Sequence, residues 1–191
     1  ADGRPFLVQG KTVTVILKME NGKFVHLHVH SHYSLLDGLG TPAQIVERAK
    51  EMGMEAVGLT DHGAMYGAID FYKAAKEAGI KPIVGCEMYV APRGLEDKVS
   101  KLDSNPYHLI LLAKNAEGYK NLMRITSIGH LKGFYYKPRI DKESLKKYSK
   151  GLIATSACIA GEIARHLLSD DEKSAERALN EYKDIFGEDF Y

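Results

Sequence analysis

Three histidines occupy every second position of an otherwise apolar run near the start of the chain. The run FVHLHVHS, residues 24–31, places His26, His28 and His30 in alternation with aliphatic side chains. Because successive side chains of a β-strand point to opposite faces of a sheet, we expect the three imidazoles to share one face. Two imidazoles on one strand face can chelate a single ion of zinc, manganese or iron. The run therefore predicts either a metal site or a polar strand face of hydrogen-bonded histidines.

Length and composition restrict the class of protein. The 191 residues fit one large domain or a part of a larger one, and 45% hydrophobic residues are enough to fill a core. A net charge of +1 predicts no overall field for nucleic acid or membrane, and no apolar run reaches the roughly 18 residues that a membrane span needs. The first residues do not form a secretory signal, and two cysteines are too few for a disulfide scaffold. We therefore expect a cytoplasmic protein with reduced thiols.

From residue 24 onward, strand-like segments alternate with helix-like segments. Thr41, Pro42 and Gln44 form a capping box with proline at the first helical position, which predicts a helix that ends at Gly53. Further strands are expected at 56–60, 81–86, 108–112 and 151–155, and further helices at 65–78, 116–131, 161–168 and 171–186, with a surface loop at 92–106. This alternation predicts an α/β fold with a parallel sheet and helices outside it. Since no glycine-rich phosphate motif is present, an incomplete β/α barrel fits better than a dinucleotide-binding fold.

The first 23 residues do not follow this alternation. Residues 11–18 form a β-like run, and Asn21-Gly22 is a dipeptide typical of hairpin turns. We interpret residues 1–23 as an extension, the edge of a neighbouring domain or an expression remnant, and residues 24–191 as the main domain.

Residues that can bind metal ions gather at one end of the predicted strands. In β/α barrels the reactive groups lie at the carboxyl ends of the strands. His108 stands at the start of its predicted strand and is an exception. The other candidates lie at or just after a strand end: His28, His30, His62, Glu87 and Cys158. This distribution predicts one shared site.

Five stretches of the sequence resemble the PHP (polymerase and histidinol phosphatase) domain family. They are FVHLHVHSHYSLLDG at 24–38, GLTDHGAMYG at 58–67, GIKPIVGCEMYV at 79–90, GFYYKPRID at 133–141 and GLIATSACIAGE at 151–162. An isolated His-x-His would be weak evidence, whereas the ordered set with these flanks is specific. The resemblance runs from Phe24 to the end of the chain. It is to the branch of the family that forms the amino-terminal domain of the alpha subunit of bacterial replicative DNA polymerases.

The resemblance implies a distorted (β/α)7 barrel that binds up to three divalent ions of zinc, manganese or iron. By position, the implied metal ligands are His28, His30, Asp37, His62, Glu87, His108 and Cys158, of which Asp37, His62 and Glu87 would also act in catalysis. His26 is explained as well by a polar or hydrogen-bonding role beside the ligands as by ligation. For Asp61 we favour a role in orienting a histidine. Cys86 is expected to be a core residue.

The end of the chain departs from the family's pattern. That pattern closes with an Asp-x-His after a late strand, and no such pair follows Cys158 here. We therefore expect a partial domain that lacks the last barrel strands and two ligands. Whether this piece holds a complete metal group and is active stays open.

The implied activity is metal-dependent phosphoester hydrolysis, in the form of 3′–5′ exonuclease proofreading. The implied partners are a DNA 3′ end, the rest of a polymerase chain and other replisome subunits. Lys132, Lys137 and Arg139 surround three aromatic residues and could contact phosphates, unless the aromatic side chains pack the loop and the charges are solvated. One alternative is a structural or docking domain without hydrolytic activity. Another is a free-standing phosphoesterase similar to histidinol phosphatase.

Overall fold

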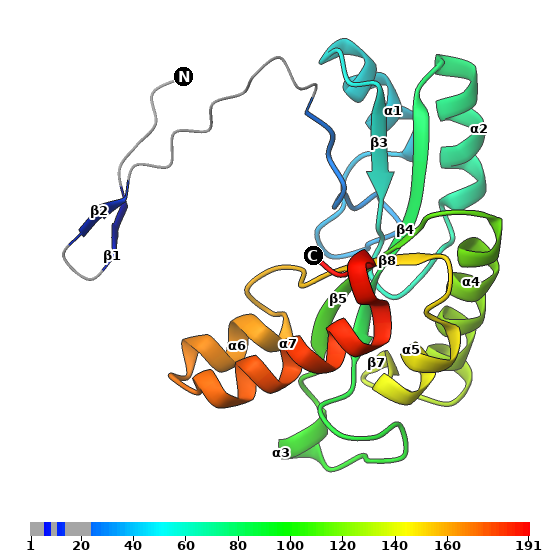
Figure 1. Ribbon diagram of the computed structural model, residues 1–191. Helices are drawn as coiled ribbons and strands as arrows, with labels where there is room; N and C mark the ends of the chain where they lie inside the picture. Colours follow the sequence, from blue (N-terminus) through cyan, green and yellow to red (C-terminus); the bar gives the residue numbers. More distant parts are fainter. Residues whose placement is uncertain (1–5, 9–10, 14–23) are drawn as a thin grey trace.

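The computed structural model describes residues 6–8, 11–13 and 24–191 (Figure 1). Strands β1 (Phe6–Val8) and β2 (Lys11–Val13) pair antiparallel. The start of the β-like run expected from residue 11 is thus confirmed, whereas its continuation and the turn expected at 21–22 lie outside the described residues. Within the described part of the chain, no helix is long and apolar enough to cross a bilayer.

The main sheet is built around one long strand. Strand β4 (Lys81–Val90) pairs through its first half with β3 (Ala56–Leu59), and through its second half with β5 (Tyr107–Ala113). The order of the sheet is β6-β7-β4-β5-β8, with β3 added to β4. The remaining strands are β6 (Phe134–Tyr135), β7 (Lys137–Ile140) and β8 (Leu152–Thr155). A ten-residue strand therefore joins two parts of the sheet.

The α/β class is confirmed, but the expected all-parallel sheet is wrong. Strand β4 runs parallel to β3 and β7, whereas β5 runs antiparallel to both β4 and β8. A parallel neighbour requires a crossover connection, which is usually a helix. The segment between β4 and β5 contains only the single turn α3 (Ser100–Asp103) among its described residues, so the chain turns back antiparallel.

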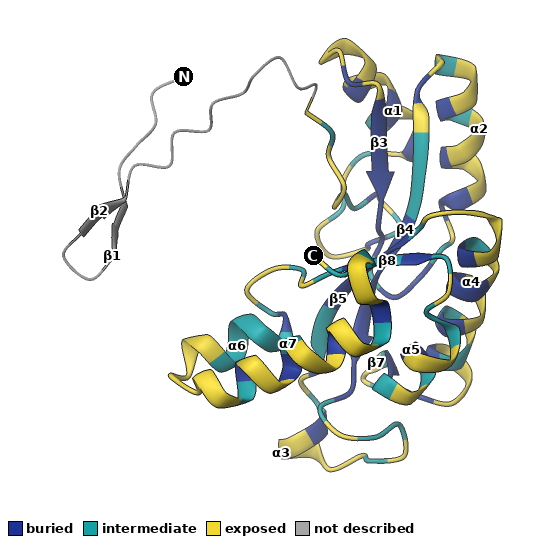
Figure 2. Cartoon of the chain, in the orientation of Figure 1, coloured by how far each residue is buried: buried dark blue, intermediate teal, exposed yellow. Residues whose placement is uncertain are grey.

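The helices lie around the sheet, and most of them carry buried residues (Figure 2). They are α1 (Pro42–Glu51), α2 (Ala68–Ala78), α4 (Ala116–Leu131), α5 (Lys142–Tyr148), α6 (Glu162–Leu168) and α7 (Glu172–Phe186), followed by the short 3-10 turn η1 (Gly187–Asp189). One core cluster packs β3 against α1 and α2, and includes Val57, Leu59 and Phe71. The other packs β4, β5 and β8 against α4, α5 and α7, and includes Leu111 and Ile125.

The helix expected after the histidine run is confirmed together with its capping box. The Thr41 hydroxyl accepts a hydrogen bond from the Gln44 backbone N–H, and the Gln44 side chain accepts one from the Thr41 N–H. Helix α2 begins at Ala68, three residues later than expected. Strands β6 and β7 and helix α5, which lie within residues 134–148, were not predicted from the sequence.

The histidine run is extended but is not a regular strand, so that prediction is corrected. Residues 24–30 lie beside β3, where the Gly58 N–H donates to the His26 carbonyl (2.7 Å) and the Thr60 N–H to the Val29 carbonyl (2.8 Å). The Val29 N–H donates to the Thr60 hydroxyl at 3.0 Å instead of to a backbone carbonyl. A side chain thus replaces one bond of the ladder. A Cβ on Gly58 would lie 2.7 Å from the Leu27 carbonyl oxygen, so the close approach requires glycine.

Candidate metal centre

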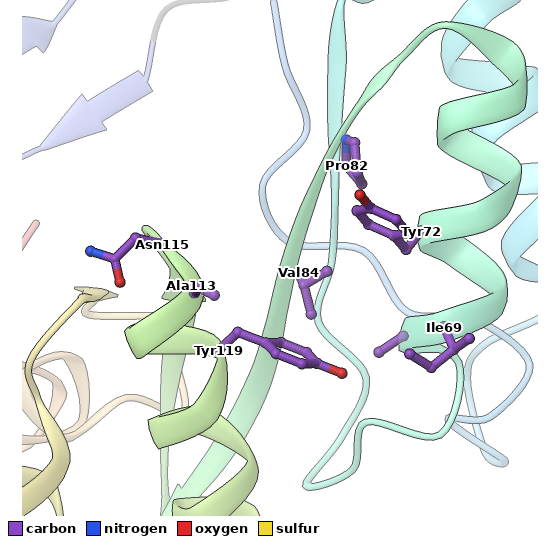
Figure 3. Close-up of a pocket in the computed structure, with 9 residues that line it drawn as sticks. Ile69, Tyr72, Pro82, Val84, Ala113, Asn115 and Tyr119 are labelled. Atoms are coloured by element: carbon purple, nitrogen blue, oxygen red, sulfur yellow. The ribbon is translucent and has the colours of Figure 1, made fainter.

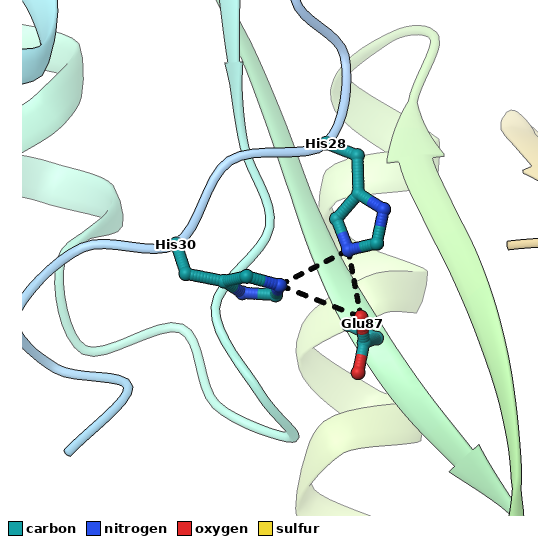
Figure 4. A group of neighbouring side chains, drawn as sticks. All are labelled: His28, His30 and Glu87. Carbon is teal, nitrogen blue, oxygen red and sulfur yellow. Dashed lines mark hydrogen bonds and ion pairs between the residues drawn. The ribbon is translucent and has the colours of Figure 1, made fainter. Parts of the chain in front are cut away.

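The Glu87 carboxylate lies at the centre of a group of imidazoles. Glu87 is only 1% exposed. Its Oε2 is 2.7 Å from His28 Nε2 and 3.5 Å from His30 Nε2. Its Oε1 is 2.7 Å from His62 Nδ1 and 2.8 Å from His108 Nδ1. The structure therefore brings four of the expected ligands to one buried carboxylate, and Figure 4 shows His28, His30 and Glu87 of this group.

Strand geometry explains how residues far apart in sequence converge. His62 follows β3 and forms an isolated parallel bridge with Glu87. His108 is paired with Tyr89 in the antiparallel register of β4 and β5, and Tyr89 shares a face of β4 with Glu87 because side chains alternate. Since β5 runs antiparallel to β4, the start of β5 lies beside the carboxyl half of β4. The position of His108 at the start of its strand is thereby explained.

Asp37 reaches the group through His62. Its Oδ2 lies 2.9 Å from His62 Nε2, so the two nitrogens of that ring contact two different carboxylates. Asp37 comes from the turn that follows the histidine run, and its side chain is 55% exposed. Asp37 therefore forms the solvent-facing edge of the group, whereas Glu87 forms its buried floor.

Cys158 lies at the other side of the group. Its Sγ is 3.8 Å from His108 Nδ1, and the residue is exposed. The preceding Ala157 has a φ of 63°, a left-handed conformation that is uncommon for alanine. This backbone turn after β8 directs the chain back across the start of β5, where the His108 N–H donates to the Ala160 carbonyl.

The buried Glu87 carboxylate is stabilised by hydrogen-bond donors and positive charge beside it. Burial alone would raise the pKa of Glu87, but hydrogen bonds from the surrounding imidazoles, His108 first, hold that pKa far below its usual range. The hydrogen bond to Glu87 is the largest cause that raises the pKa of His62 to about 9. The hydrogen bond with His62 lowers the pKa of Asp37. Without a metal, a proton on the His62 imidazole supplies positive charge between the two carboxylates.

The residues present fit a transition-metal ion. His28, His30 and Glu87 each offer a ligand atom, and these atoms lie within 4.8 Å of one another. The Nε2 atoms of His28 and His30 are 3.0 Å apart, and His30 Nδ1 is buried without a hydrogen-bond partner among the described residues. Imidazole nitrogens with a carboxylate oxygen are the donors that zinc, manganese and iron accept. A cation would satisfy lone pairs that now face one another.

Asp61 has a different role from the one expected of it. It is 2% exposed and accepts hydrogen bonds from the Ser31 N–H (2.6 Å), the Ser31 hydroxyl (2.8 Å) and the Ser34 hydroxyl (2.7 Å). These contacts differ from the expected contact with a histidine. Asp61 instead holds the turn at residues 31–38, which connects His30 to Asp37. The Ser34 hydroxyl also accepts from the His62 N–H, at 3.2 Å.

Two further residues, His26 and Cys86, are not placed as metal ligands. His26 is exposed, and its ring packs edge-on against Phe24 with centroids 4.7 Å apart. It lines a hollow with Gln44 and Arg48 rather than the space around Glu87. Cys86 is completely buried, as expected for a core residue, and burial raises its pKa above the usual range.

The expected contact of Arg139 with DNA is corrected by the structure. Arg139 is fully buried, and its guanidinium donates to the carbonyls of Gly133, Leu95, Asp97 and Asp103. A guanidinium whose donors are engaged inside the protein cannot reach a phosphate. This arginine instead holds the loop between β4 and β5.

The two lysines of that set remain at the surface. Lys132 is exposed and lines a hollow with Asp141 and Glu143, and its contact with DNA stays a prediction. Lys137 is exposed at the start of β7, and its Nζ lies 5.3 Å from the centre of the Tyr89 ring. Only Lys137 is therefore placed beside the metal-ligand group.

A cleft opens directly beside the group. Its volume is about 450 Å³, and Asp37, His62 and His108 form part of its wall. The rest of its wall consists of aromatic side chains and one lysine (Tyr33, Tyr66, Tyr89, His130 and Lys137), together with Ser34, Leu35, Leu36, Ala64 and Pro138. We call this space the aromatic cleft. The tyrosines were not predicted from the sequence to belong to the site. For Tyr89 a usable signal existed, because residues two apart on one strand, such as Glu87 and Tyr89, point to the same face.

Another hollow lies beside the first half of β4, between α2 and α4 (Figure 3). Its volume is about 360 Å³, and its wall includes Ile69, Tyr72, Val84 and Tyr119. It has no carboxylate, imidazole or thiol among the described residues that line it. This hollow therefore offers no candidate metal ligand among its described lining residues.

Comparison with known proteins decides the family. Residues 26–191 match the PHP domain. The chain belongs to the PHP domain family. The resemblance inferred from the five sequence stretches is thereby confirmed.

Relatives of this PHP domain include proteins named DNA polymerase III subunit alpha. The chain is 54% identical over 170 residues to DNA polymerase III subunit alpha of Borreliella burgdorferi, covering 88% of this chain and 15% of that protein. It is 47% identical over 182 residues to the Helicobacter pylori subunit, covering 90% of this chain and 15% of that protein. The chain thus spans about 15% of the length of these curated relatives.

Solved structures give more distant likenesses. An amidohydrolase from Chromobacterium violaceum is 28% identical with a TM-score of 0.41, covering 56% of this chain and 33% of that chain. A two-domain protein from Bacteroides vulgatus that contains a predicted PHP-like metal-dependent phosphoesterase is 14% identical with a TM-score of 0.43, covering 83% of this chain and 48% of that chain.

Proposed function

We propose that this PHP domain serves a replicative DNA polymerase and hydrolyses phosphoesters at the 3′ end of DNA, as a 3′–5′ proofreading exonuclease. The observation that carries the proposal is the buried Glu87 carboxylate with four imidazoles directed at it. A purely structural domain has no physical need for this arrangement. The identity of 44–54% to alpha subunits of DNA polymerase III supports the polymerase context.

The proposed cofactor is a set of up to three divalent ions of zinc, manganese or iron. The residues that would hold them are His28, His30, Asp37, His62, Glu87, His108 and Cys158. Bound ions of this kind lower the pKa of a water molecule and stabilise charge on a departing oxygen.

The protein's own residues prepare the site in three ways. Glu87 gathers the imidazoles because its buried charge attracts them and fixes their ring orientations. His62 holds a proton at neutral pH while no metal is bound, and it releases that proton before its nitrogen can serve as a ligand. Asp37, at the solvent-facing edge, orients His62 from the side of the aromatic cleft.

The proposed partners are a DNA 3′ end, the remainder of a polymerase chain and further replisome subunits. The open side of the aromatic cleft supports access by a chain end, because Asp37 and Tyr66 at its rim are more than half exposed.

The test uses the full-length protein and its His62→Ala and Glu87→Ala variants. We expect the wild type to bind two or three transition-metal ions per domain by elemental analysis and to shorten single-stranded DNA from the 3′ end with Mn²⁺. Both variants should lose this hydrolysis and retain nucleotide incorporation. Asp184→Ala, an exposed carboxylate on α7, is the matched control and should behave as wild type.

Two outcomes would contradict the proposal. Absence of transition metal from the purified protein would contradict the proposed metal site. Unchanged hydrolysis in both variants would show that the exonuclease activity lies elsewhere. Hydrolysis of a small phosphomonoester with no action on DNA would favour a phosphatase similar to histidinol phosphatase. Loss of polymerase assembly in the variants, without any hydrolysis by the wild type, would favour a structural or docking domain.

A further inference from the structure

The aromatic cleft contains features that the metal ligands do not require. Its wall continues from Asp37, His62 and His108 to side chains that do not contact Glu87. A small phosphate ester could be hydrolysed at the metal-ligand group without them. The chemistry of these additional side chains therefore indicates which other part of the substrate would bind in the cleft.

One part of the cleft is an exposed aromatic surface. Tyr66 is 65% exposed, and its ring centroid lies 6.3 Å from that of Tyr33 and 6.5 Å from that of His130. His130 is fixed in place because its Nε2 donates to the Gly63 carbonyl at 2.8 Å. Between two aromatic neighbours, the Tyr66 ring offers a free face to a planar group. Nucleobases stack on such faces without regard to sequence.

The other part of the cleft carries a positive charge. Lys137 Nζ lies 5.3 Å from the Tyr89 ring centre, and the Tyr89 ring in turn lies 5.2 Å from the His108 ring and 6.1 Å from the His62 ring. Among the described residues Lys137 forms no ion pair with a carboxylate. Its ammonium group is therefore available to an anion that enters the cleft.

The backbone before Lys137 is held in a tight turn. Tyr135 and Lys137 are paired across the β6–β7 hairpin, so Tyr136 alone forms the turn. Tyr136 has a φ of 59°, in the left-handed region that tyrosine rarely adopts. Strand β7 is paired with β4 at Tyr89–Arg139, which fixes the hairpin to the strand that carries Glu87.

We propose that the aromatic cleft binds one nucleotide unit beside the metal-ligand group, with the base stacked on Tyr66 and a phosphate held by Lys137. This inference rests on the proposed function and names the residues of that same site that would hold the substrate's base and phosphate. It assigns Tyr66 and Lys137 as specificity-determining residues for nucleic acid over small phosphomonoesters. Neither residue is a metal ligand, so both can be replaced while the group around Glu87 stays intact.

The experiment compares two DNA substrates in the full-length protein with Mn²⁺. One is a single-stranded oligonucleotide with a thymidine at its 3′ end, and the other carries an abasic unit there. Tyr66→Ala should raise KM for the thymidine substrate about tenfold and leave the abasic substrate unchanged, because only the stacking interaction is lost. Lys137→Ala should raise KM for both substrates about tenfold, because a charge-assisted contact to phosphate is lost from each.

Conservative variants and controls separate binding from folding. Tyr66→Phe and Lys137→Arg should restore KM to near the wild-type value. Tyr72→Ala and Lys73→Ala remove an exposed tyrosine and an exposed lysine from α2 and should change neither substrate's KM. Metal content by elemental analysis should equal that of the wild type in every variant.

The failures of the two proposals are distinguishable. If hydrolysis depends on His62 but Tyr66→Ala and Lys137→Ala show wild-type KM on both substrates, the nucleotide cleft is overturned and the exonuclease stands. If Tyr66→Ala raises KM equally for both substrates, the stacking role is overturned. If no hydrolysis depends on His62, both proposals fall.

Discussion

Two buried carboxylates lie at the same edge of the sheet in contrasting surroundings. Asp61 follows β3 and accepts hydrogen bonds from a backbone N–H and the hydroxyls of Ser31 and Ser34. Glu87 lies in β4 and faces four imidazole nitrogens. Both are almost inaccessible to solvent, with exposures of 2% and 1%. Their difference lies in their partners and not in their burial.

The comparison distinguishes a structural carboxylate from a ligand. Neutral N–H and O–H donors satisfy Asp61, and nothing further is needed to stabilise it. The imidazoles around Glu87 carry lone pairs of their own, so the group is complete only with protons or a cation. A buried carboxylate surrounded by bases is therefore the stronger indication of a metal site.

Loss of the Glu87 carboxylate should have the largest effect. For Glu87→Ala we expect metal affinity to fall by more than about 100-fold, which exceeds the loss typical for a residue that only orients a ligand. Competition titration with a metal-sensitive dye measures the change. The comparison with Asp61 fails if folded Asp61→Asn protein loses affinity to the same extent.

Loss of the Asp61 carboxylate should act on folding. Asp61→Ala leaves one backbone N–H and two hydroxyls without their buried acceptor, so we expect the free energy of unfolding to fall by about 2–3 kcal/mol. Urea denaturation of the chelator-treated protein gives this value. Asp184→Ala on the surface should change it by less than about 0.5 kcal/mol. Equal stability of the two variants would show that the Asp61 contacts contribute nothing net.

A smaller effect on the free energy of unfolding is expected for a substitution in the turn at 31–38. A Cβ on Gly38 would lie 1.8 Å from the Ser31 carbonyl oxygen, so Gly38→Ala must displace the turn that Asp61 holds. We expect a loss of about 1–2 kcal/mol in the free energy of unfolding. Gly53→Ala is not a suitable control because Gly53 has a φ of 72°. Gly40→Ala, where a Cβ would lie 3.5 Å from Ile45, should cost less. The same denaturation series tests both variants, and a more harmful Gly40→Ala would contradict the expectation.

The smallest effect is a pH dependence of the metal-free protein. The pKa of His62 is about 9 in the folded protein, against about 6.5 for an unperturbed histidine. Its stabilising contribution is complete below pH 6.5 and is lost as the pH rises through about 9. Because the imidazole is partly exposed and screened by solvent, we expect a decrease of about 1 kcal/mol.

Denaturation of chelator-treated protein at pH 6 and pH 9.5 measures this decrease. His62→Gln should abolish the contribution of His62, whereas His32→Gln, an exposed histidine, should preserve it. A free energy of unfolding that rises over this interval in the wild type alone would contradict the assignment.

Local patterns in the sequence predicted the elements with strong local signals. The capping box of Thr41 and Gln44 indicated α1, and apolar runs indicated β3, β5 and β8. The direction of β5 was predicted wrongly, although the loop expected at 92–106, with no crossover helix, was a usable signal for an antiparallel neighbour. The hairpin β6–β7 was missed because its strands are only two and four residues long.

The expected ligands were largely brought together, because the first half of the antiparallel strand β5 lies beside the carboxyl ends of β4 and β8. The partners of Asp61 and Arg139 could not be predicted. Asp61 precedes His62 by one position, yet it is directed to Ser31 and Ser34. Buried Arg139 donates hydrogen bonds to the carbonyls of residues 95, 97, 103 and 133. The convergence of these carbonyls depends on the tertiary fold and is not visible in any local sequence pattern.

The spread of the candidate ligands along the chain has a consequence for folding. His28 and Glu87 are 59 positions apart, and His108 and Cys158 are 50 apart. An ion that joined them would bind the folded chain, where these residues meet, and not the unfolded chain, where they are apart, so its binding free energy would add to the stability of the fold. Metal supply would then govern how long the folded chain survives proteolysis, apart from any reaction at the site.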